Sequence, residues 1–221
     1  MRLLVFDFDG LILDTEAPVY DAWQAIYAEH GHTLAFEKWA ECIGTVDAFD
    51  PCEDLQALCG RPLDATALEQ RHRADCDALI ALQAVLPGVR EYVEEARRLG
   101  LRLGVASSSS RAWVEGHLTR LGLREHFDVV RCRDDVPVVK PDPALYLAVL
   151  AATGVPPRDA VALEDSPNGV WAAKRAGLTC VAVPNPLTAR LDLAHADVTL
   201  RSLAELPLSE LLARLRARRG A

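Results

Sequence analysis

The sequence predicts an α/β fold in which a doubly wound parallel sheet carries a helical segment inserted after its first strand. An apolar run, Leu3–Phe6, leads directly into acidic residues, as expected for a buried strand that ends at the ligand-binding edge of such a sheet. From residue 101 onward, strand-like and helix-like segments alternate. Between these parts, residues 17–83 show helical periodicity. We therefore expect a Rossmann-like core that is interrupted once by a helical domain.

The expected elements follow from apolar runs, helical periodicity and turn residues. The insertion is rich in Ala, Leu, Glu and Trp; Pro87 and Gly88 close it, and Gly100 ends the helix that follows. The expected strands after it are 101–106, 129–130, 161–163 and 180–183, and the expected helices are 89–99, 112–121, 143–153, 168–176 and 203–218.

Chain length and these elements define the expected domains. A chain of 221 residues suits one core domain with a modest insertion. We expect residues 1–16 and 85–221 to form the core and residues 17–84 to form a helical cap. Residues near 16–18 and 84–88 would then be the two strands of the hinge between them.

Composition and charge limit which partners and which cellular compartment we expect for this protein. The formal net charge of −8 offers no general attraction to nucleic acid or to an anionic membrane. The sequence shows neither a leader peptide nor an apolar run long enough to span a bilayer. Its six cysteines are scattered without a CxxC pair, which favours reduced thiols over a zinc site. We expect a cytoplasmic monomer that binds neither nucleic acid nor membranes.

Two carboxylates, Asp7 and Asp9, follow the first strand two residues apart. Carboxylates at this edge of a sheet suit a hard cation such as Mg²⁺. Asp7 could attack phosphorus while Asp9 supplies the proton that a leaving alkoxide needs. Gly10 lacks a Cβ where the chain must turn sharply beside a ligand, and Thr15 can cap or hydrogen-bond the loop. An isolated Asp-x-Asp could also be a solvated turn, so other motifs must agree with it.

A run of serines, Ser107–Ser110, begins where the strand from Leu101 ends and a helix begins. The simplest interpretation is a helix N-cap, for which serine is well suited. Hydroxyls and free amides at a helix N-terminus also form a phosphate site. Ser107 and Ser108 are therefore candidates for phosphate binding.

Lys140 lies in a loop that Pro141 and Pro143 stiffen. The chain has only three lysines, so this one does not belong to a lysine-rich surface. A rigid ammonium here would offset the charge of Asp7 and of a transferring phosphoryl group. Viewed alone, Lys140 could also be an ordinary surface residue of a loop.

Glu164 and Asp165 stand at the end of another apolar strand, with a helix behind them. Asp165 is placed to ligate a metal directly. We expect Glu164 to act through a bound water, because Mg²⁺ keeps several waters in protein sites. The alternative is that both acids simply cap the following helix.

The four motifs together resemble the haloacid dehalogenase-like (HAD) phosphohydrolase superfamily, whose first motif matches Asp7-x-Asp9-Gly10-x-x-x-Asp14-Thr15. All four motifs occur in the required order, and the resemblance covers residues 1–200. It implies a Mg²⁺ site formed by Asp7, the backbone carbonyl of Asp9, and Asp165. It also implies an aspartyl-phosphate on Asp7, later hydrolysed by water that Asp9 activates. Ser107 would bind the phosphoryl oxygens, and Ser108 would add its backbone amide.

The helical insertion between the first and second motifs is typical of the small helical cap subclass, which is similar to β-phosphoglucomutase, phosphoglycolate phosphatase and sugar-phosphate phosphatases. Asp9 argues against dehalogenation, since dehalogenases of this superfamily lack an acid there. Mutases of this type carry a His where this chain has Val19, and an Arg in the loop where this chain has 44–48. The second phosphate of a mutase substrate would also be repelled by Asp47.

These features favour a Mg²⁺-dependent phosphatase that acts on a small phosphorylated metabolite, a sugar or polyol phosphate. Three alternatives remain open: a mutase, a phosphonate hydrolase that would use Lys38 as its Schiff-base lysine, and a HAD-like binding module without turnover. The expected substrate-binding residues are Gly10, Thr15, Glu16, Thr45, Asp47 and Ser108.

Overall fold

The computed structural model describes residues 1–43 and 49–219. Within these residues the chain forms a six-stranded sheet with the order β3-β2-β1-β4-β5-β6, in which every neighbouring pair is parallel. The strands are β1 (Leu3–Phe6), β2 (Arg102–Ala106), β3 (Val129–Arg131), β4 (Ala160–Glu164), β5 (Thr179–Ala182) and β6 (Val198–Thr199). From β1 the chain first adds β2 and β3 on one side and then adds β4, β5 and β6 on the other side. This is the doubly wound sheet that the sequence predicts.

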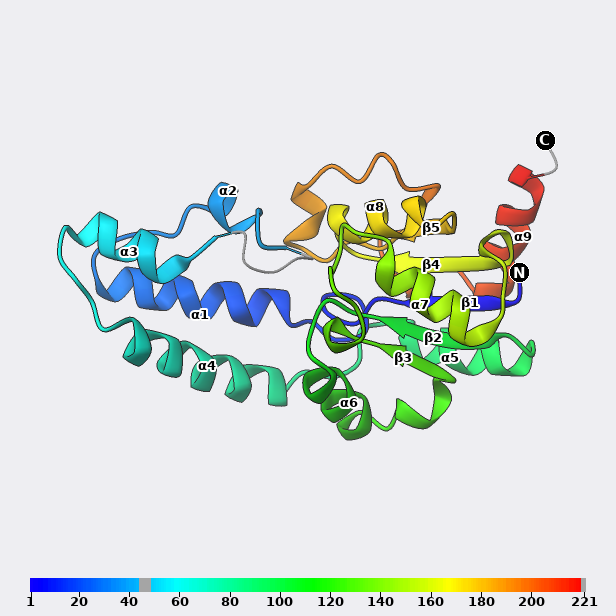
Figure 1. Ribbon diagram of the computed structural model, residues 1–221, viewed down its shortest axis with the longest axis horizontal. Helices are drawn as coiled ribbons and strands as arrows, with labels where there is room; N and C mark the ends of the chain where they lie inside the picture. The colour runs from blue at the N-terminus through cyan, green and yellow to red at the C-terminus, as the bar shows by residue number, and fades with distance from the viewer. Residues whose placement is uncertain (44–48, 220–221) are drawn as a thin grey trace.

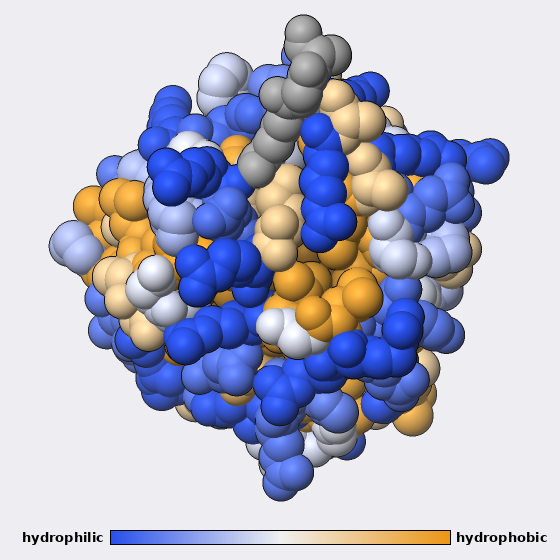
Figure 2. All heavy atoms as spheres, turned by 90° about the vertical axis from the view of Figure 1, so that its right-hand side faces the viewer, coloured by the Kyte–Doolittle hydropathy of each residue, from blue (hydrophilic) through white to orange (hydrophobic). Residues whose placement is uncertain are grey.

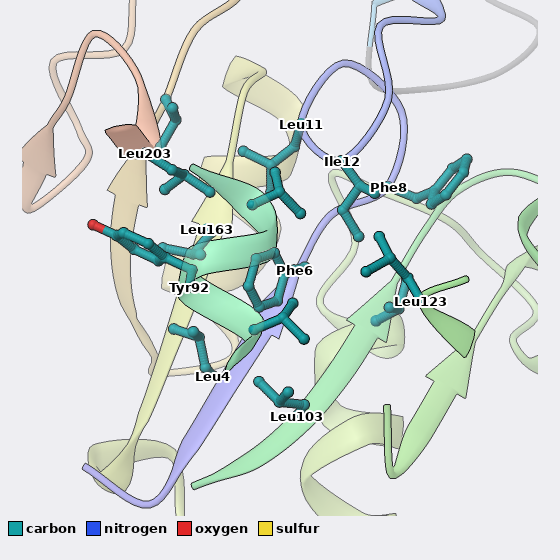
Figure 3. Close-up of a cluster of buried hydrophobic side chains, with 14 of the residues drawn as sticks. Leu4, Phe6, Phe8, Leu11, Ile12, Tyr92, Leu103, Leu123, Leu163 and Leu203 are labelled. Carbon is teal, nitrogen blue, oxygen red and sulfur yellow. The ribbon is translucent and has the colours of Figure 1, made fainter. Parts of the chain in front are cut away.

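Helices cover both faces of the sheet (Figure 1). The helices of the sheet region are α5 (Val89–Arg98), α6 (Arg111–Arg120), α7 (Ala144–Thr153), α8 (Pro167–Arg175) and α9 (Leu208–Arg219). Leu4 and Phe6 point to the face covered by α5, α6 and α9, where Figure 3 shows them beside Tyr92. Leu3 and Val5 point to the opposite face, covered by α7 and α8. Because β1 is buried on both faces, its sequence is apolar throughout.

The helical insertion lies beyond the carboxyl ends of the strands, away from the chain termini (Figure 1). Its helices are α1 (Glu16–Glu29), α2 (Phe36–Trp39), α3 (Pro51–Cys59) and α4 (Ala65–Ala81). They share their own apolar cluster, which includes Trp23, Tyr27 and Trp39. The insertion therefore stands over the sheet edge at which the acidic motifs end.

Of the two connections expected between insertion and core, the one at 84–88 agrees with the structure and the one at 16–18 does not. Leu13 pairs with Val85 in an antiparallel bridge, and the amide of Leu86 donates to the carbonyl of Ile12. Residues 16–18, expected in the hinge, lie in the first turn of α1 instead. The carboxylate of Asp14 accepts from the amide of Ala17 and so caps this helix early.

The expectation of one helix over residues 203–218 is also wrong. Leu203–Glu205 form a single 3₁₀ turn, and α9 begins only at Leu208. Pro207 separates the two because it has no amide hydrogen to continue a helix. The two-residue strand β6 is a further element that the apolar pattern did not predict.

Figure 2 shows the end of the molecule opposite the helical insertion. Hydrophilic side chains cover most of this face, and apolar side chains gather in smaller groups between them. Among the residues that the structure describes, no helix combines the length and the hydropathy that crossing a lipid bilayer requires.

Candidate active site

The carboxyl ends of β1 and β4 bring Asp7 and Glu164 to a common cation. Nζ of Lys140 lies 2.6 Å from Oδ1 of Asp7 and 2.7 Å from Oε1 of Glu164. Oε1 of Glu164 also accepts from the hydroxyl of Tyr146 on α7. All four side chains are buried. Lys140 is therefore part of the interior of the site, and its alternative assignment as a surface loop residue does not hold.

Asp165 lies beside Asp7, and a hydrogen bond from Asn185 orients its carboxylate. Nδ2 of Asn185 donates to Oδ2 of Asp165 at 2.8 Å. Gly10 passes so close that a Cβ there would collide with the Asp165 carboxylate, and its φ of +74° already favours glycine. Gly10 thus provides space for Asp165, while its predicted contact with substrate stays a prediction.

The acidic cluster has the chemistry of a divalent-cation site. One carboxylate oxygen from each of Asp7, Glu164 and Asp165 lies within 4.8 Å of the other two. Burial and the charge of Glu164 raise the pKa of Asp7, although Lys140 opposes them. Burial and the charge of Asp7 raise the pKa of Asp165 well above the usual range. A hard cation bound by these oxygens would relieve that repulsion, so the residues fit Mg²⁺.

Asp9 accepts hydrogen bonds at both carboxylate oxygens. Oδ1 accepts from Thr15 Oγ1 at 3.0 Å and from Trp113 Nε1 at 2.9 Å. Oδ2 accepts from Ser107 Oγ at 3.2 Å and from Ser109 Oγ at 2.7 Å. Thr15 thus serves Asp9 rather than capping α1, since its side chain makes no cap hydrogen bond.

The serine run forms the turn between β2 and α6. Ser107 is fully buried, and its Oγ accepts from the amide of Ser109 at 3.0 Å. Ser110 is the N-cap of α6, because its hydroxyl accepts from the amide of Trp113. The capping interpretation therefore holds for Ser110, and Ser107 and Ser109 hydrogen-bond to Asp9. Phosphate binding by Ser107 and Ser108 stays a prediction.

A cavity of about 190 Å³ opens over these residues. Its lining comes from both core and insertion and consists of Asp7, Asp9, Thr15, Glu16, Val19, Cys42, Ser108, Ser109, Trp113 and Lys140. Glu16 enters it from the first turn of α1, where burial and the charge of Asp9 raise its pKa to about 8. The expected substrate-binding residues Thr45 and Asp47 lie outside the described residues.

Four residues of the site were not predicted from the sequence: Ser109, Trp113, Tyr146 and Asn185. Ser109 belongs to the serine run and could have been included with Ser107. Tyr146 and Trp113 occupy helices whose periodicity predicts only packing. Asn185 follows β5 in a Pro-Asn-Pro stretch that is typical of a turn.

The sequence of this chain matches a known protein family and several of its members. The profile of the haloacid dehalogenase-like hydrolases matches residues 1–177. YhcW of Bacillus subtilis (strain 168), a putative phosphatase by name, is 44% identical over 212 residues, covering 96% of each chain. Hexitol phosphatase B of Escherichia coli (strain K12) is 34% identical over 216 residues, or 94% of this chain and 95% of its own.

A solved structure agrees with these matches over nearly the whole chain. CbbY from Rhodobacter sphaeroides, determined in complex with phosphate, is 34% identical and superposes with a TM-score of 0.71. The match covers 93% of this chain and 96% of that one, so it includes both core and insertion. The resemblance seen in the four motifs is confirmed: this chain is an enzyme that belongs to the haloacid dehalogenase-like hydrolase family.

Proposed function

We propose that this protein is a Mg²⁺-dependent phosphatase that hydrolyses a small phosphate monoester, a sugar or polyol phosphate, through an aspartyl-phosphate on Asp7. The observation that carries the proposal is the pairing of Asp7 with Lys140, 2.6 Å apart, at the wall of a cavity that Asp9 also lines. A nucleophilic carboxylate, a fixed cation and a second carboxylate are the groups that this chemistry requires.

The residues that would hold Mg²⁺ are Asp7, Asp165 and the backbone carbonyl of Asp9, with Glu164 acting through a water. When bound, the cation supplies positive charge that screens the phosphoryl oxygens from the attacking carboxylate. Glu164 has a second role that the structure supports, since its Oε1 accepts from Lys140 and Tyr146 and so orients the ammonium.

The chain's own residues account for both chemical steps. In the first, an oxygen of Asp7 attacks phosphorus, the bond to the substrate oxygen breaks, and Asp9 donates a proton to the leaving alkoxide. In the second, Asp9 takes a proton from water, the resulting hydroxide attacks the aspartyl-phosphate, and phosphate leaves with Asp7 restored. Lys140 offsets charge on the phosphoryl group throughout, and Ser107 and Ser108 bind its oxygens.

The cavity lining supports hydrolysis over phosphoryl transfer between two positions of a sugar. Val19 lines the cavity, so an apolar side chain occupies the position at which mutases of this type carry a His. Glu16 offers a hydrogen-bonding group to substrate hydroxyls. The name of hexitol phosphatase B supports a polyol or sugar phosphate as the substrate class.

We also propose that residues 17–84 act as a cap on a core formed by 1–16 and 85–221, in a cytoplasmic monomer. Two contacts between the parts support this arrangement. Nδ2 of Asn168 donates to the carbonyl of Ile43 at 3.0 Å, and the guanidinium of Arg190 lies 3.5 Å from the ring centroid of Phe36. Such contacts would hold the cap over bound substrate and exclude water.

The test is release of free phosphate, in the presence of Mg²⁺, from a panel of hexose, pentose and polyol phosphates, phosphoglycolate and nucleotides. We expect release to concentrate on one sugar or polyol class and to disappear in Asp7→Asn. The matched control is Asp21→Asn, which alters an exposed acid of α1 and should retain full activity. Equal rates for Asp7→Asn and wild type would refute the assigned nucleophile.

The mutase alternative is tested on β-glucose 1-phosphate. Efficient formation of glucose 6-phosphate without free phosphate would overturn the phosphatase assignment. Mg²⁺ binding without turnover on any panel member would instead indicate a binding module.

A further inference from the structure

Among the described residues, four side chains donate hydrogen bonds to Asp9, and they are of two chemical kinds. Thr15, Ser107 and Ser109 present hydroxyls, which can donate or accept a hydrogen bond. Trp113 presents an indole N–H, which can only donate. Its Nε1 lies 2.9 Å from Oδ1 of Asp9.

This difference favours one of the two carboxylate oxygens of Asp9 as the site of its proton. In the arrangement described, each carboxylate oxygen accepts two hydrogen bonds, which uses both of its lone pairs. A proton on Oδ2 requires only that the hydroxyl of Ser107 or Ser109 turn to accept or move aside. At Oδ1 the hydroxyl of Thr15 can turn in the same way, but the indole cannot reverse. A proton on Oδ1 would leave that oxygen facing the N–H donor of Trp113, so Oδ2 is the favoured site.

Trp113 is held firmly enough to impose this constraint. It lies in the first turn of α6, where its amide donates to the capping hydroxyl of Ser110. The ring of His117, one turn further along α6, packs edge-on against the indole with centroids 4.4 Å apart. His117 also stacks on Phe8, the residue between the two aspartates of the motif. Trp113 is therefore linked to the Asp-x-Asp motif twice: directly through its hydrogen bond to Asp9, and through His117, which packs on Phe8.

We propose that Trp113 is a positioning residue for the acid–base carboxylate: its indole fixes Oδ1 of Asp9 and directs the catalytic proton to Oδ2. This role rests on the proposed phosphatase function. In the first step the Oδ2–H bond breaks as its proton passes to the alkoxide oxygen, and Asp9 returns to a carboxylate. In the second step Oδ2 takes a proton from the attacking water.

The test compares two substrates that differ in their need for that proton. Alkoxides of sugars and polyols are poor leaving groups that require protonation, whereas p-nitrophenolate leaves readily without it. Trp113→Phe removes the N–H and keeps an aromatic ring against His117. We expect kcat/KM for the best sugar or polyol phosphate to fall by about tenfold or more, a part of the 10²–10⁴ that general acid catalysis contributes. For p-nitrophenyl phosphate, kcat/KM of the same variant should change by less than about threefold.

The matched control is Trp171→Phe, which alters a partly exposed tryptophan of α8 and should leave both substrates unaffected. Equal losses of Trp113→Phe on both substrates, or no loss on either, would overturn the positioning role. Thermal melting of each variant shows whether the fold is retained. A wild-type protein that hydrolyses neither substrate refutes the proposed function itself, which is a different result from an active enzyme with an unchanged substrate ratio.

A second measurement examines the hydrogen bond without turnover. With ¹⁵N-labelled tryptophan, the four indole N–H groups of the chain give separate NMR signals, and the signal absent from Trp113→Phe identifies Trp113. We expect this signal to move upfield and its hydrogen to exchange faster in Asp9→Ala, while the Trp171 signal stays in place. An unchanged Trp113 signal would refute the bond on which the proposal depends.

Discussion

The ammonium of Lys140 lies 2.6 Å from Oδ1 of Asp7, although 133 positions separate the two residues in sequence. The same ammonium lies 2.7 Å from Oε1 of Glu164, so one cation serves two buried carboxylates. Burial lowers the pKa of Lys140, but Asp7 and Glu164 more than reverse this effect, and the group stays protonated. The site therefore contains a permanent positive charge next to the proposed nucleophile.

Removing this cation should destabilise the fold as well as abolish activity. Lys140→Met leaves Asp7 and Glu164 buried without their common partner, a change that costs about 3–5 kcal/mol for buried pairs. We expect this loss in the free energy of unfolding, measured with urea at pH 7.5. The control Lys38→Met alters a half-exposed pair with Asp54 and should cost less than about 1 kcal/mol. A Lys140→Met variant as stable as wild type would contradict the buried pairing.

Asn185 should determine how tightly the site binds Mg²⁺. Its amide is the donor that orients Asp165, and loss of such a supporting bond typically weakens metal affinity by about 10–100-fold. We expect a loss of this size for Asn185→Ala in calorimetric titration with Mg²⁺. Asn168→Ala is the control, because that amide contacts the carbonyl of Ile43 instead. Equal Mg²⁺ affinities for the two variants would exclude the supporting role.

Stabilisation by Mg²⁺ should increase with pH. The pKa values of Asp7 and Asp165 are raised in the folded protein, so above about pH 4 the metal-free folded state holds more protons than the unfolded chain. These groups therefore contribute less stability as pH rises toward neutrality. Bound Mg²⁺ requires their ionised forms and removes this penalty. The difference in melting temperature between Mg²⁺ and EDTA should be larger at pH 8 than at pH 5.5, and the reverse order would contradict the acidic site.

Glu16 should lower stability at alkaline pH in the metal-free protein. Its pKa is raised from 4.5 to about 8, first by burial and then by the charge of Asp9, so folding becomes less favourable as pH rises through this interval. Glu16→Gln removes the ionisable group. We expect urea unfolding to show a more stable variant at pH 8 and a much smaller difference at pH 5. Glu37→Gln, at an exposed site of α2, should show no such pH dependence.

Apolar runs and helical periodicity predict the class of the fold correctly, but they misplace individual elements. The class of sheet follows from apolar strands that end in polar motifs, and it is confirmed. The domain bounds of 17–84 for the insertion stay a prediction. The prediction of one helix over 203–218 is wrong because Pro207 has no amide hydrogen to bond to the preceding turn, so α9 begins only at Leu208. The prediction of a hinge at 16–18 is wrong because these residues already lie in the first turn of α1, where the carboxylate of Asp14 accepts from the amide of Ala17.

The sequence by itself determined the four motifs, their order, and the positions of three of them at the carboxyl ends of parallel strands. Since such strands end at one edge of a sheet, Asp7 and Asp165 are expected to lie close together. Lys140 reaches them from the loop between β3 and α7, a placement that only the tertiary structure decided. Only the tertiary structure decided which side chains support them. Trp113 and Asn185 reach Asp9 and Asp165 from a helix and a turn distant in sequence, and such contacts depend on how packed elements align, which local periodicity does not encode.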